Sequence, residues 1–370
     1  MSSDLVPETR VLAVASHVVY GHVGNKMATL VMQSMGCEVA ALNTVNFSNH
    51  AGYRQLKGTR ATADEIRSLY EGLCQSNLTD FDVMLSGYAP SAAAVEAVNA
   101  IGQDLKRKAA DRPGSFFWVL DPVMGDQGRL YVNDDVVPAY KSIIDHADLI
   151  LPNQFEAEVL SGIQITSLHT LAEAITTLHA TYKIPHIIIT SVQLSKLSSS
   201  PEPKSESDAL SPENSLTVIG STVLSTGKPR LFRIDVPAID CFFSGTGDMF
   251  AALTVARLRE AVFANGDLDL RNTQSWVSKD DVSPTELPLA KATEKVLASM
   301  HNVLEKTIEA RDAELAATAS SVVGEGSEEE VKKREYLRLT KAAEVRLVRN
   351  TRYLRQPTVE FKAEEWKGDL

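Results

Sequence analysis

The residues best suited to chemistry lie within residues 242–252, where Gly245-Thr246-Gly247 precedes Asp248 and an apolar helical pattern follows. Glycine lets a ligand approach the main chain closely. The free N–H groups at a helix start, together with the positive end of the helix dipole, bind anions such as phosphate. The stretch therefore predicts a phosphate site. An ordinary helix N-cap is the competing interpretation, because Asp and Thr are common at that position.

Asp248 is the residue in this stretch that could move a proton. A carboxylate beside a phosphate site can take the proton from an attacking hydroxyl group as a general base. Its place at the start of a predicted helix favours the ionised form, which can only accept hydrogen bonds. We therefore predict that Asp248 is ionised and faces whatever group attacks the phosphate.

Further acidic and amide side chains follow predicted strands. Asp121 and Asp126 come after a buried run at 115–120. Asn153 and Glu156 follow a later strand. Such oxygens suit Mg²⁺ or an alkali cation, which would neutralise ATP phosphates during phosphoryl transfer while the Gly-Thr-Gly amides stabilise the developing charge. Singly, each side chain could be a cap or a solvated surface group, whereas the set together indicates a cation site.

The elements that must position these residues alternate along the chain between short β-branched runs and helical patterns. This alternation is typical of an α/β fold with a mostly parallel central sheet flanked by helices on both faces. In such sheets ligands bind outside the carboxyl ends of the strands, where the polar clusters fall. The expected strands are 11–15, 37–42, 82–85, 115–120, 148–151, 186–190, 216–223 and 230–234, and the main expected helices are 63–73, 92–108, 246–259 and 289–310.

Three polar segments interrupt this pattern. Residues 195–215 and 265–288 are predicted to be flexible insertions, and 318–330 a mobile segment before a charged C-terminal helix. That helix is expected to present a solvated face rather than a binding surface. We expect residues 1–370 to form a single domain with its core at about 11–311.

Composition excludes several classes of protein. With 37 basic and 48 acidic residues the formal net charge is −11, which disfavours binding to nucleic acid or to an anionic membrane. Three cysteines are too few and too scattered for a disulfide framework or a zinc site, and they suit a reducing compartment. No secretory signal or membrane span is expected from the apolar runs.

Known motifs narrow the function further. The nearest approach to a P-loop, at residues 24–27, lacks the Gly-Lys-Ser/Thr order, and Phe250 replaces the third glycine of a dinucleotide fingerprint. The chain also lacks a Gly-x-Ser-x-Gly nucleophile elbow. The phosphate site is therefore predicted to work without a P-loop lysine.

A set of short motifs extends over about 11–262, and the helix 289–310 follows them. The motifs are Ser16-His17-Val18, Gly21-x-Val23-Gly24-Asn25, Phe47-Ser48-Asn49-His50, Gly52-Tyr53, Ser86-Gly87-Tyr88, Asp121-Pro122-Val123-x-Gly125-Asp126, Pro152-Asn153-Gln154-Phe155-Glu156-Ala157-Glu158, Ile189-Thr190-Ser191 and Gly245-Thr246-Gly247-Asp248. Together with this helix they resemble a known family, the pyridoxal kinases of the ribokinase superfamily. The loop that begins at Phe47 and the run 152–158 are more specific to vitamin B6 kinases than the Gly-Thr-Gly-Asp stretch.

The resemblance implies a ribokinase-like fold and transfer of the ATP γ-phosphate to the 5′-hydroxymethyl group of pyridoxal, pyridoxine or pyridoxamine. It assigns Asp248 as the catalytic base, which also contacts the substrate. The positions that match the substrate site are Ser16, Val23, Phe47 and Tyr88. The positions that match the nucleotide site are Asp121, Tyr131, Thr190, Ser191, Ile239, Gly245, Thr246 and Gly247, and the metal positions are Asp126, Asn153 and Glu156. Without the resemblance, Phe47 and Tyr88 would be interpreted as core packing.

The resemblance also implies Mg²⁺ with ATP, K⁺ or another monovalent cation, a homodimer, and a cytoplasmic location with the nucleus as a second compartment. Two positions depart from the family pattern. Ala51 and Leu151 stand where the family often has threonine, so the preferred vitamer and the need for a monovalent cation are open. The alternatives are a related kinase acting on a hydroxymethylpyrimidine or a sugar, and a catalytically idle B6-binding protein.

Overall fold

The computed structural model describes residues 5–126, 128–192, 215–264, 268–318 and 327–367. One ten-stranded sheet runs through the molecule in the order β12-β11-β10-β9-β8-β5-β4-β1-β2-β3. Strands β9 to β2 pair in parallel, and antiparallel strands complete both edges of the sheet. The strands are β1 (Arg10–Val18), β2 (Glu38–Phe47), β3 (Gly58–Arg60), β4 (Val83–Ser86), β5 (Phe117–Leu120), β8 (Leu149–Ile150), β9 (His186–Val192), β10 (Ser215–Val223), β11 (Pro229–Pro237) and β12 (Glu364–Glu365); a separate hairpin pairs β6 (Gly125–Asp126) with β7 (Arg129–Leu130).

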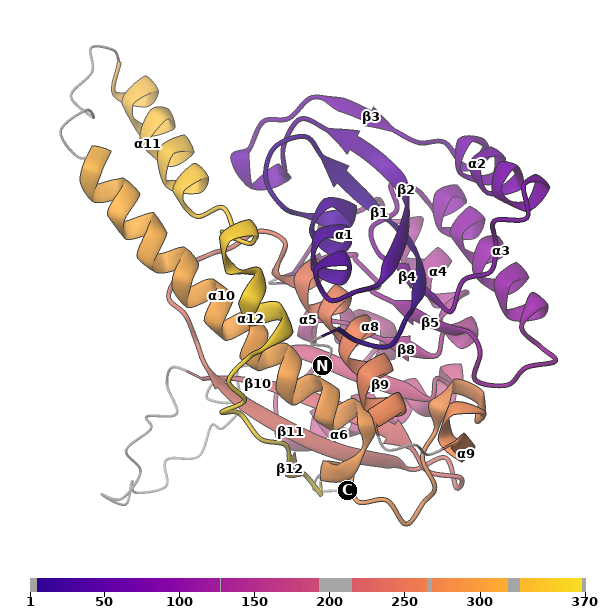
Figure 1. The fold of residues 1–370 in the computed structure, drawn as a ribbon. Coiled ribbons are helices and arrows are strands. Elements are labelled where there is room, and N and C mark those ends of the chain that lie inside the picture. Colours follow the sequence, from indigo (N-terminus) through magenta and orange to yellow (C-terminus); the bar gives the residue numbers. More distant parts are fainter. Residues whose placement is uncertain (1–4, 127, 193–214, 265–267, 319–326, 368–370) are drawn as a thin grey trace, which may run out of the picture.

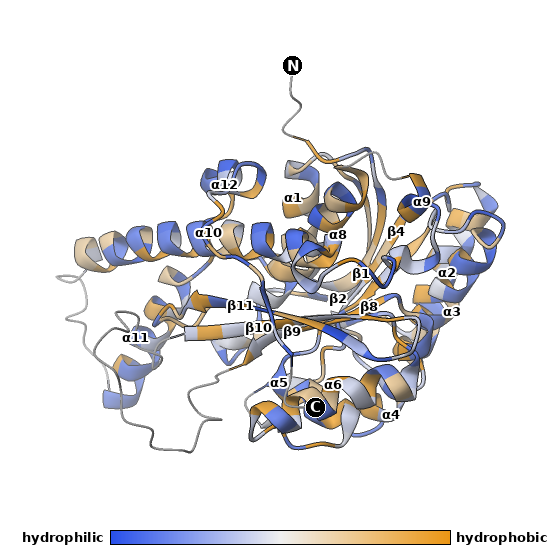
Figure 2. Ribbon diagram, turned by 90° about the horizontal axis from the view of Figure 1, so that it is seen from below, coloured by the Kyte–Doolittle hydropathy of each residue, from blue (hydrophilic) through white to orange (hydrophobic). Residues whose placement is uncertain are grey.

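Helices cover both faces of the sheet, as the alternating sequence pattern predicts (Figure 2). On one face lie α1 (Gly24–Ser34), α8 (Thr246–Ala264), α10 (Pro288–Thr318) and α12 (Thr351–Arg355). On the other face lie α2 (Ala63–Gln75), α3 (Ala92–Lys108), α4 (Val136–Lys141), α5 (Gln154–Ser161) and α6 (Leu168–Tyr182). The remaining helices are η1 (Ala51–Tyr53), η2 (Ile144–His146), α9 (Leu268–Arg271), η4 (Gln274–Trp276), η5 (Pro284–Glu286), α11 (Glu328–Ala342) and η7 (Val348–Asn350).

Strand β1 shows why the sheet divides the core into two. Successive side chains of a strand point to opposite faces. Val11 and Ala13 accordingly pack with the helices of one face, while Leu12 and Val14 pack with those of the other. Because both faces are covered, every one of these residues is apolar and buried.

The segment predicted as a flexible insertion over 265–288 differs from that expectation in its described part, 268–288. Trp276 is 3 % exposed and stacks on Phe117, with ring centroids 4.3 Å apart. The main-chain oxygen of Ser275 also lies 2.7 Å from Nε2 of His186 on β9. Between these two attachments the side chains of the segment mostly face solvent. Its composition is therefore polar and resembles that of a flexible loop.

The other two polar segments fall partly outside the described residues. The predicted insertion 195–215 is described only at Ser215, the first residue of β10. Within the predicted mobile segment 318–330, Thr318 ends α10 and residues 328–330 belong to α11, while 319–326 are outside the described residues. Helices α10 and α11 lie side by side and extend beyond the sheet (Figure 1), and Arg338 donates a 2.9 Å hydrogen bond to Thr318.

Candidate functional site

The stretch Gly245-Thr246-Gly247-Asp248 forms the approach to α8 and its first turn. Gly245 has a φ of +85°, a conformation that L side chains rarely adopt. A Cβ atom at Gly245 would lie 2.3 Å from the main-chain oxygen of His22, so a side chain cannot be accommodated there. The Met249 N–H bonds to the Gly245 oxygen at 2.9 Å and begins the helix. The predicted glycine-dependent helix start is therefore present.

Asp248 lies in the first turn of α8, beside the start of α1. The main-chain N–H of Gly24 donates a hydrogen bond to its carboxylate. Burial raises the pKa of Asp248 to about 6, and the Gly24 bond opposes that increase without cancelling it. The carboxylate is thus mainly ionised at neutral pH, as predicted, although its pKa is raised rather than lowered.

Two more carboxylates share this region. Burial, with the charges of Glu156 and Asp248 close by, raises the pKa of Asp121 well above its usual range. A Cβ atom at Gly247 would lie 4.0 Å from Oδ2 of Asp121, which puts that carboxylate against the start of α8. Burial raises the pKa of Glu156 to about 7, against the hydrogen bonds from three main-chain N–H groups. Like charges held together in this way favour a bound cation.

Glu156 and Asn153 brace the loop that carries Asp126. They form a capping box at the start of α5, in which each side chain accepts from the other residue's main-chain N–H. The Glu156 carboxylate also accepts from Met124 N at 2.8 Å, and Asn153 Nδ2 donates to the Gly125 oxygen at 2.8 Å. Both predicted metal residues therefore have a visible positioning role in the loop.

The donor set fits a magnesium ion that arrives with a nucleotide. Among the described residues no three His, Cys, Asp or Glu side chains are grouped closely enough to hold a metal by themselves. Mg²⁺ usually keeps several waters and takes one or two carboxylates plus substrate phosphates. Asp121, Asp126 and Glu156 supply hard oxygen ligands of that kind without forming a complete protein cage.

A cavity of about 310 Å³ opens next to this cluster, between the sheet and α10. It brings together predicted nucleotide and metal positions from four separate parts of the chain. Those that line it are Asp126, Thr190, Ser191, Ile239, Thr246 and Gly247. Asp121, Tyr131 and Gly245 are not among its lining residues, and Tyr131 is 58 % exposed.

The apolar wall of this cavity was not predicted as part of a site. It is built by β10, β11, the loop before α8, α8 itself and α10. Its residues are Leu216, Val218, Val236, Pro237, Cys241, Phe242, Phe243, Phe250, Leu297, Met300, His301 and Leu304. Sequence periodicity does find Met300 and Leu304 in a helical stripe, but a stripe of this kind does not distinguish a ligand wall from core packing. A polar end and an apolar wall suit a nucleotide.

The predicted substrate positions lie at the ends of three neighbouring strands, β4, β1 and β2. Ser16 is on β1 and adjoins Gly24, whose Cβ would lie 2.3 Å from Ser16 Oγ. Phe47 ends β2, and the Arg60 guanidinium lies 5.2 Å from its ring. Tyr88 follows β4, and its main-chain oxygen accepts a 2.7 Å hydrogen bond from Thr44.

Val23 completes this group as the residue before α1, where its extended backbone turns the chain into the helix. The loop after β2 reaches from this group to the start of α8. A Cβ at Gly52 in η1 would lie 3.1 Å from Ser244 Oγ, immediately before Gly245. The strand-end group and the phosphate site are therefore adjacent, with Asp248 beside Gly24 and Val23.

The two departures from the family pattern have different surroundings. Ala51 begins η1 and is exposed at the loop. Leu151 is 3 % exposed and packs into the apolar core below α8. A substitution at Ala51 therefore changes an exposed position of the loop, whereas Leu151 belongs to the hydrophobic core.

A glycine-dependent helix start, a carboxylate in its first turn and further carboxylates at strand ends are the arrangement expected of a phosphotransferase of the ribokinase type. A family model for phosphomethylpyrimidine kinase matches residues 81–262. Human pyridoxal kinase is 35 % identical over 312 residues, covering 83 % of this chain and 88 % of the human protein. The Ovis aries pyridoxal kinase is 36 % identical over 306 residues, covering 81 % and 86 %.

Solved structures agree with these relatives. The structure of pyridoxal kinase from Leishmania donovani with ADP and pyridoxamine is 28 % identical, with a TM-score of 0.72 and coverage of 97 % of this chain and 99 % of that one. The chain belongs to the pyridoxal kinase family. The predicted ribokinase-like fold and the predicted family are thereby confirmed. Among the described residues no helix combines the length and apolar character needed to cross a bilayer.

Proposed function

We infer that the protein transfers the γ-phosphate of ATP to the 5′-hydroxymethyl group of pyridoxal, and also of pyridoxine and pyridoxamine. The product from pyridoxal is pyridoxal 5′-phosphate. The observation that supports this best is the position of Asp248, which lies between the nucleotide cavity and the acceptor positions Ser16, on β1, and Val23, at the start of α1.

Asp248 takes the proton from the hydroxyl group of the acceptor. The hydroxyl oxygen bonds to the γ-phosphorus, the bond from that phosphorus to the bridging oxygen breaks, and ADP leaves with the bond's electron pair. The N–H groups of Gly245-Thr246-Gly247 at the start of α8 stabilise the charge on the transferring group. A base with a pKa near the working pH suits this role, and burial raises that of Asp248 to about 6.

The pyridine ring of the acceptor is bound by Ser16, Val23, Phe47 and Tyr88. The Ser16 hydroxyl can hydrogen-bond a ring nitrogen or the phenolic oxygen, and the aromatic rings offer surfaces for stacking. The nucleotide binds on the other side of Asp248, where the apolar wall holds its adenine ring. The residues that bind it are Thr190, Ser191, Ile239, Thr246 and Gly247, which line the cavity, together with Asp121, Tyr131 and Gly245.

Mg²⁺ would be held by Asp126, Asn153 and Glu156, with Asp121 nearby, and K⁺ or another monovalent cation would bind in the same acidic region. When bound, the metal neutralises phosphate charge and orients the γ-phosphate. The support for this assignment is that burial, together with the charge of neighbouring carboxylates, raises the pKa of Glu156 and of Asp121, and a cation would offset both effects.

The chain is further proposed to form one kinase domain, to assemble as a homodimer and to act in the cytoplasm, with the nucleus as a second compartment. The reduced cysteines suit such compartments, and none of Cys37, Cys74 and Cys241 is paired.

A hydroxymethylpyrimidine kinase is the nearest alternative, because the family model for phosphomethylpyrimidine kinase matches residues 81–262. The test is a coupled ADP-release assay with pyridoxal, pyridoxine, pyridoxamine, hydroxymethylpyrimidine and ribose, each with and without K⁺. We expect turnover of the three vitamers. Turnover of the pyrimidine or ribose without pyridoxal would refute the assignment, and no turnover of any acceptor would indicate an idle binding protein.

A further inference from the structure

The segment that follows α11 reaches across the molecule to the loop beside the acceptor site. Glu344 is 8 % exposed, and its Oε1 accepts a 2.8 Å hydrogen bond from the Tyr53 hydroxyl. The same oxygen lies 3.0 Å from Nε2 of His50. A Cβ at Gly21 would lie 2.6 Å from its Oε2, so the loop between β1 and α1 also rests on this carboxylate. One side chain therefore joins three parts of the chain.

Helix α11 makes a second attachment to the same loop. The Tyr336 hydroxyl donates a 2.6 Å hydrogen bond to the main-chain oxygen of Gly52. The Arg54 guanidinium lies over the Tyr336 ring at 4.1 Å. A Cβ at Gly52 would lie 3.1 Å from Ser244 Oγ, so the loop is adjacent to the residue before Gly245. The helix predicted to be a solvated face thus contacts the loop that adjoins the phosphate site.

The Glu344 contact is charged and largely shielded from water. Burial alone would raise the pKa of Glu344, but the hydrogen bonds from His50 and Tyr53, with His50 and His22 nearby, hold it below its usual range. A buried carboxylate that accepts charge-assisted hydrogen bonds is costly to remove, because its partners are then left without an acceptor.

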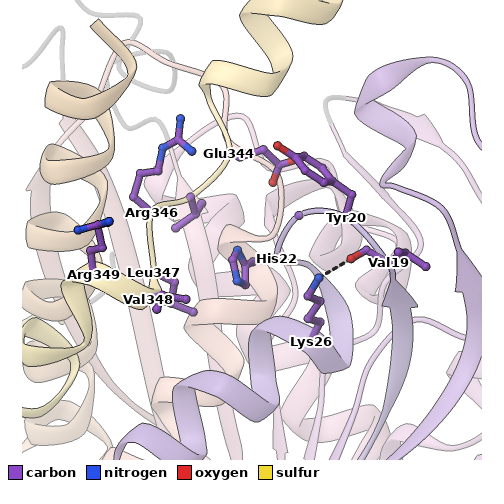
Figure 3. A pocket seen from close by; sticks show the side chains of 11 residues that line it. Val19, Tyr20, His22, Lys26, Glu344, Arg346, Leu347, Val348 and Arg349 are labelled. Atoms are coloured by element: carbon purple, nitrogen blue, oxygen red, sulfur yellow. Dashed lines mark hydrogen bonds between the residues drawn. The ribbon is translucent and has the colours of Figure 1, made fainter. Parts of the chain in front are cut away.

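A further hydrogen bond joins the two segments beside Glu344, between His22 and the main chain of Val345. A cavity of about 360 Å³ separates residues 19–22 and Lys26 from residues 344–349 (Figure 3). In Figure 3 the side chains of Glu344 and Tyr20 come from the two segments that line the cavity, with His22 between these segments. Val345 and Leu347 are buried in the apolar core, whereas the loop of residues 48–57 is attached to Glu344 and Tyr336 by polar bonds.

We propose that Glu344 is a positioning residue for the acceptor. By holding His50 and Tyr53 it fixes the loop of residues 48–57, which carries Ala51, against Ser244 and the start of α8. Tyr336 on α11 is a second brace for the same loop. The consequence for KM rests on the proposed function, because it requires the acceptor to bind beside Phe47 and Ala51.

The test is Glu344→Gln, which keeps the size of the side chain and removes its charge. We expect the KM for pyridoxal to rise about tenfold or more, while the KM for ATP stays within about twofold, as for loss of one buried charged hydrogen-bond acceptor. The matched control is Glu329→Gln, an exposed residue of α11, for which both constants should stay at the wild-type values.

Hydrogen–deuterium exchange of the amides at 48–57 gives a second measurement that needs no substrate. Exchange should accelerate in Glu344→Gln and, more weakly, in Tyr336→Phe, with no acceleration in α3. If exchange becomes faster but the KM for pyridoxal does not change, Glu344 does hold the loop in place. That result would contradict the proposed location of the acceptor beside this loop. Unchanged loop exchange, or an equal rise of both KM values with general acceleration across the protein, would overturn the proposal.

A double-mutant comparison of Glu344 and Tyr53 distinguishes a positioning role of Glu344 from a general loss of stability. If Glu344 acts through Tyr53, the effect of Tyr53→Phe on the KM for pyridoxal should nearly vanish in the Glu344→Gln background. Fully additive effects of the two substitutions would contradict a shared role.

Discussion

The nucleotide side and the acceptor side of the site are built in different ways. The nucleotide side is formed by strand ends and by the start of α8, which are fixed by the core on both faces of the sheet. The acceptor side has strand ends too, but the loop that adjoins it is held by Tyr336 and Glu344, 284 and 294 residues away from their partners Gly52 and His50. The nucleotide side is thus the rigid half of the site, whereas the order of the acceptor half depends on a few hydrogen bonds between residues far apart in the sequence.

The largest effect is expected at Asp248, which belongs to both sides. Asp248→Asn keeps the shape of the side chain but cannot accept the proton. Turnover of pyridoxal should fall by about 10²–10⁴-fold. Binding of ADP, measured by calorimetry, should change little. Wild-type turnover in this variant would show that another group is the base, and loss of ADP binding would show that the substitution disturbs the rigid half instead.

The acidic cluster of the nucleotide side should make thermal stability depend on cations and pH. Glu156 and Asp248 have folded-state pKa values of about 7 and about 6, above those of the unfolded chain. Their stabilising contribution is therefore complete below the unfolded pKa values and is lost as pH rises through about 6 to 7. Without metal, Tm should decrease over that interval, and MgADP should reduce the decrease. An equal decrease with and without MgADP would argue against a cation in this cluster.

A smaller effect is expected for substitutions in α10, where residues of the apolar wall should differ from residues that do not line the cavity. Leu304→Ala removes part of the wall of the nucleotide cavity and should raise the KM for ATP about tenfold, since about 1–2 kcal/mol of apolar contact is lost. Ile308→Ala, one turn further along the same stripe, is the matched control because Ile308 does not line the cavity. Equal changes in both variants, or an equal rise in the KM for pyridoxal, would mean that the wall does not contact the nucleotide.

The smallest effect is expected at the acceptor loop itself. Ala51→Thr restores the hydroxyl that the family often has, and one hydrogen bond is worth about 0.5–1.5 kcal/mol. The ratio of kcat/KM among pyridoxal, pyridoxine and pyridoxamine should shift by about two- to tenfold, with no change in the KM for ATP. An altered KM for ATP with constant vitamer ratios would contradict the division between the two sides.

The rigid half could be predicted from sequence because its signals are local. Strand β5 is an apolar run that ends at Asp121, and the approach to α8 carries two glycines before Asp248. Each signal lies within a few residues of the side chain that it positions. The strand-end rule then brings separate clusters together without knowledge of their contacts.

The remaining features depend on contacts between distant residues, which leave no periodic pattern. Glu344 lies in a charged region that predicts only a solvated surface, and its partners are in another loop. Trp276 lies in a polar segment, yet its Nε1 donates to the Gly114 oxygen at 2.9 Å. The apolar wall likewise combines β10, β11 and α10, each of which is explained as core when considered alone.

The most direct test of the central claim is the pH dependence of kcat/KM for pyridoxal between about pH 5 and 8, in wild type and in Asp248→Asn. Because the pKa of Asp248 is about 6, wild-type activity should decrease as pH falls through that value and the base becomes protonated. The residual activity of Asp248→Asn should lack this decrease, whereas titration of the substrates would persist in both proteins. The same decrease in both proteins, or a wild-type profile that is flat through pH 6, would contradict the role of Asp248 as the base.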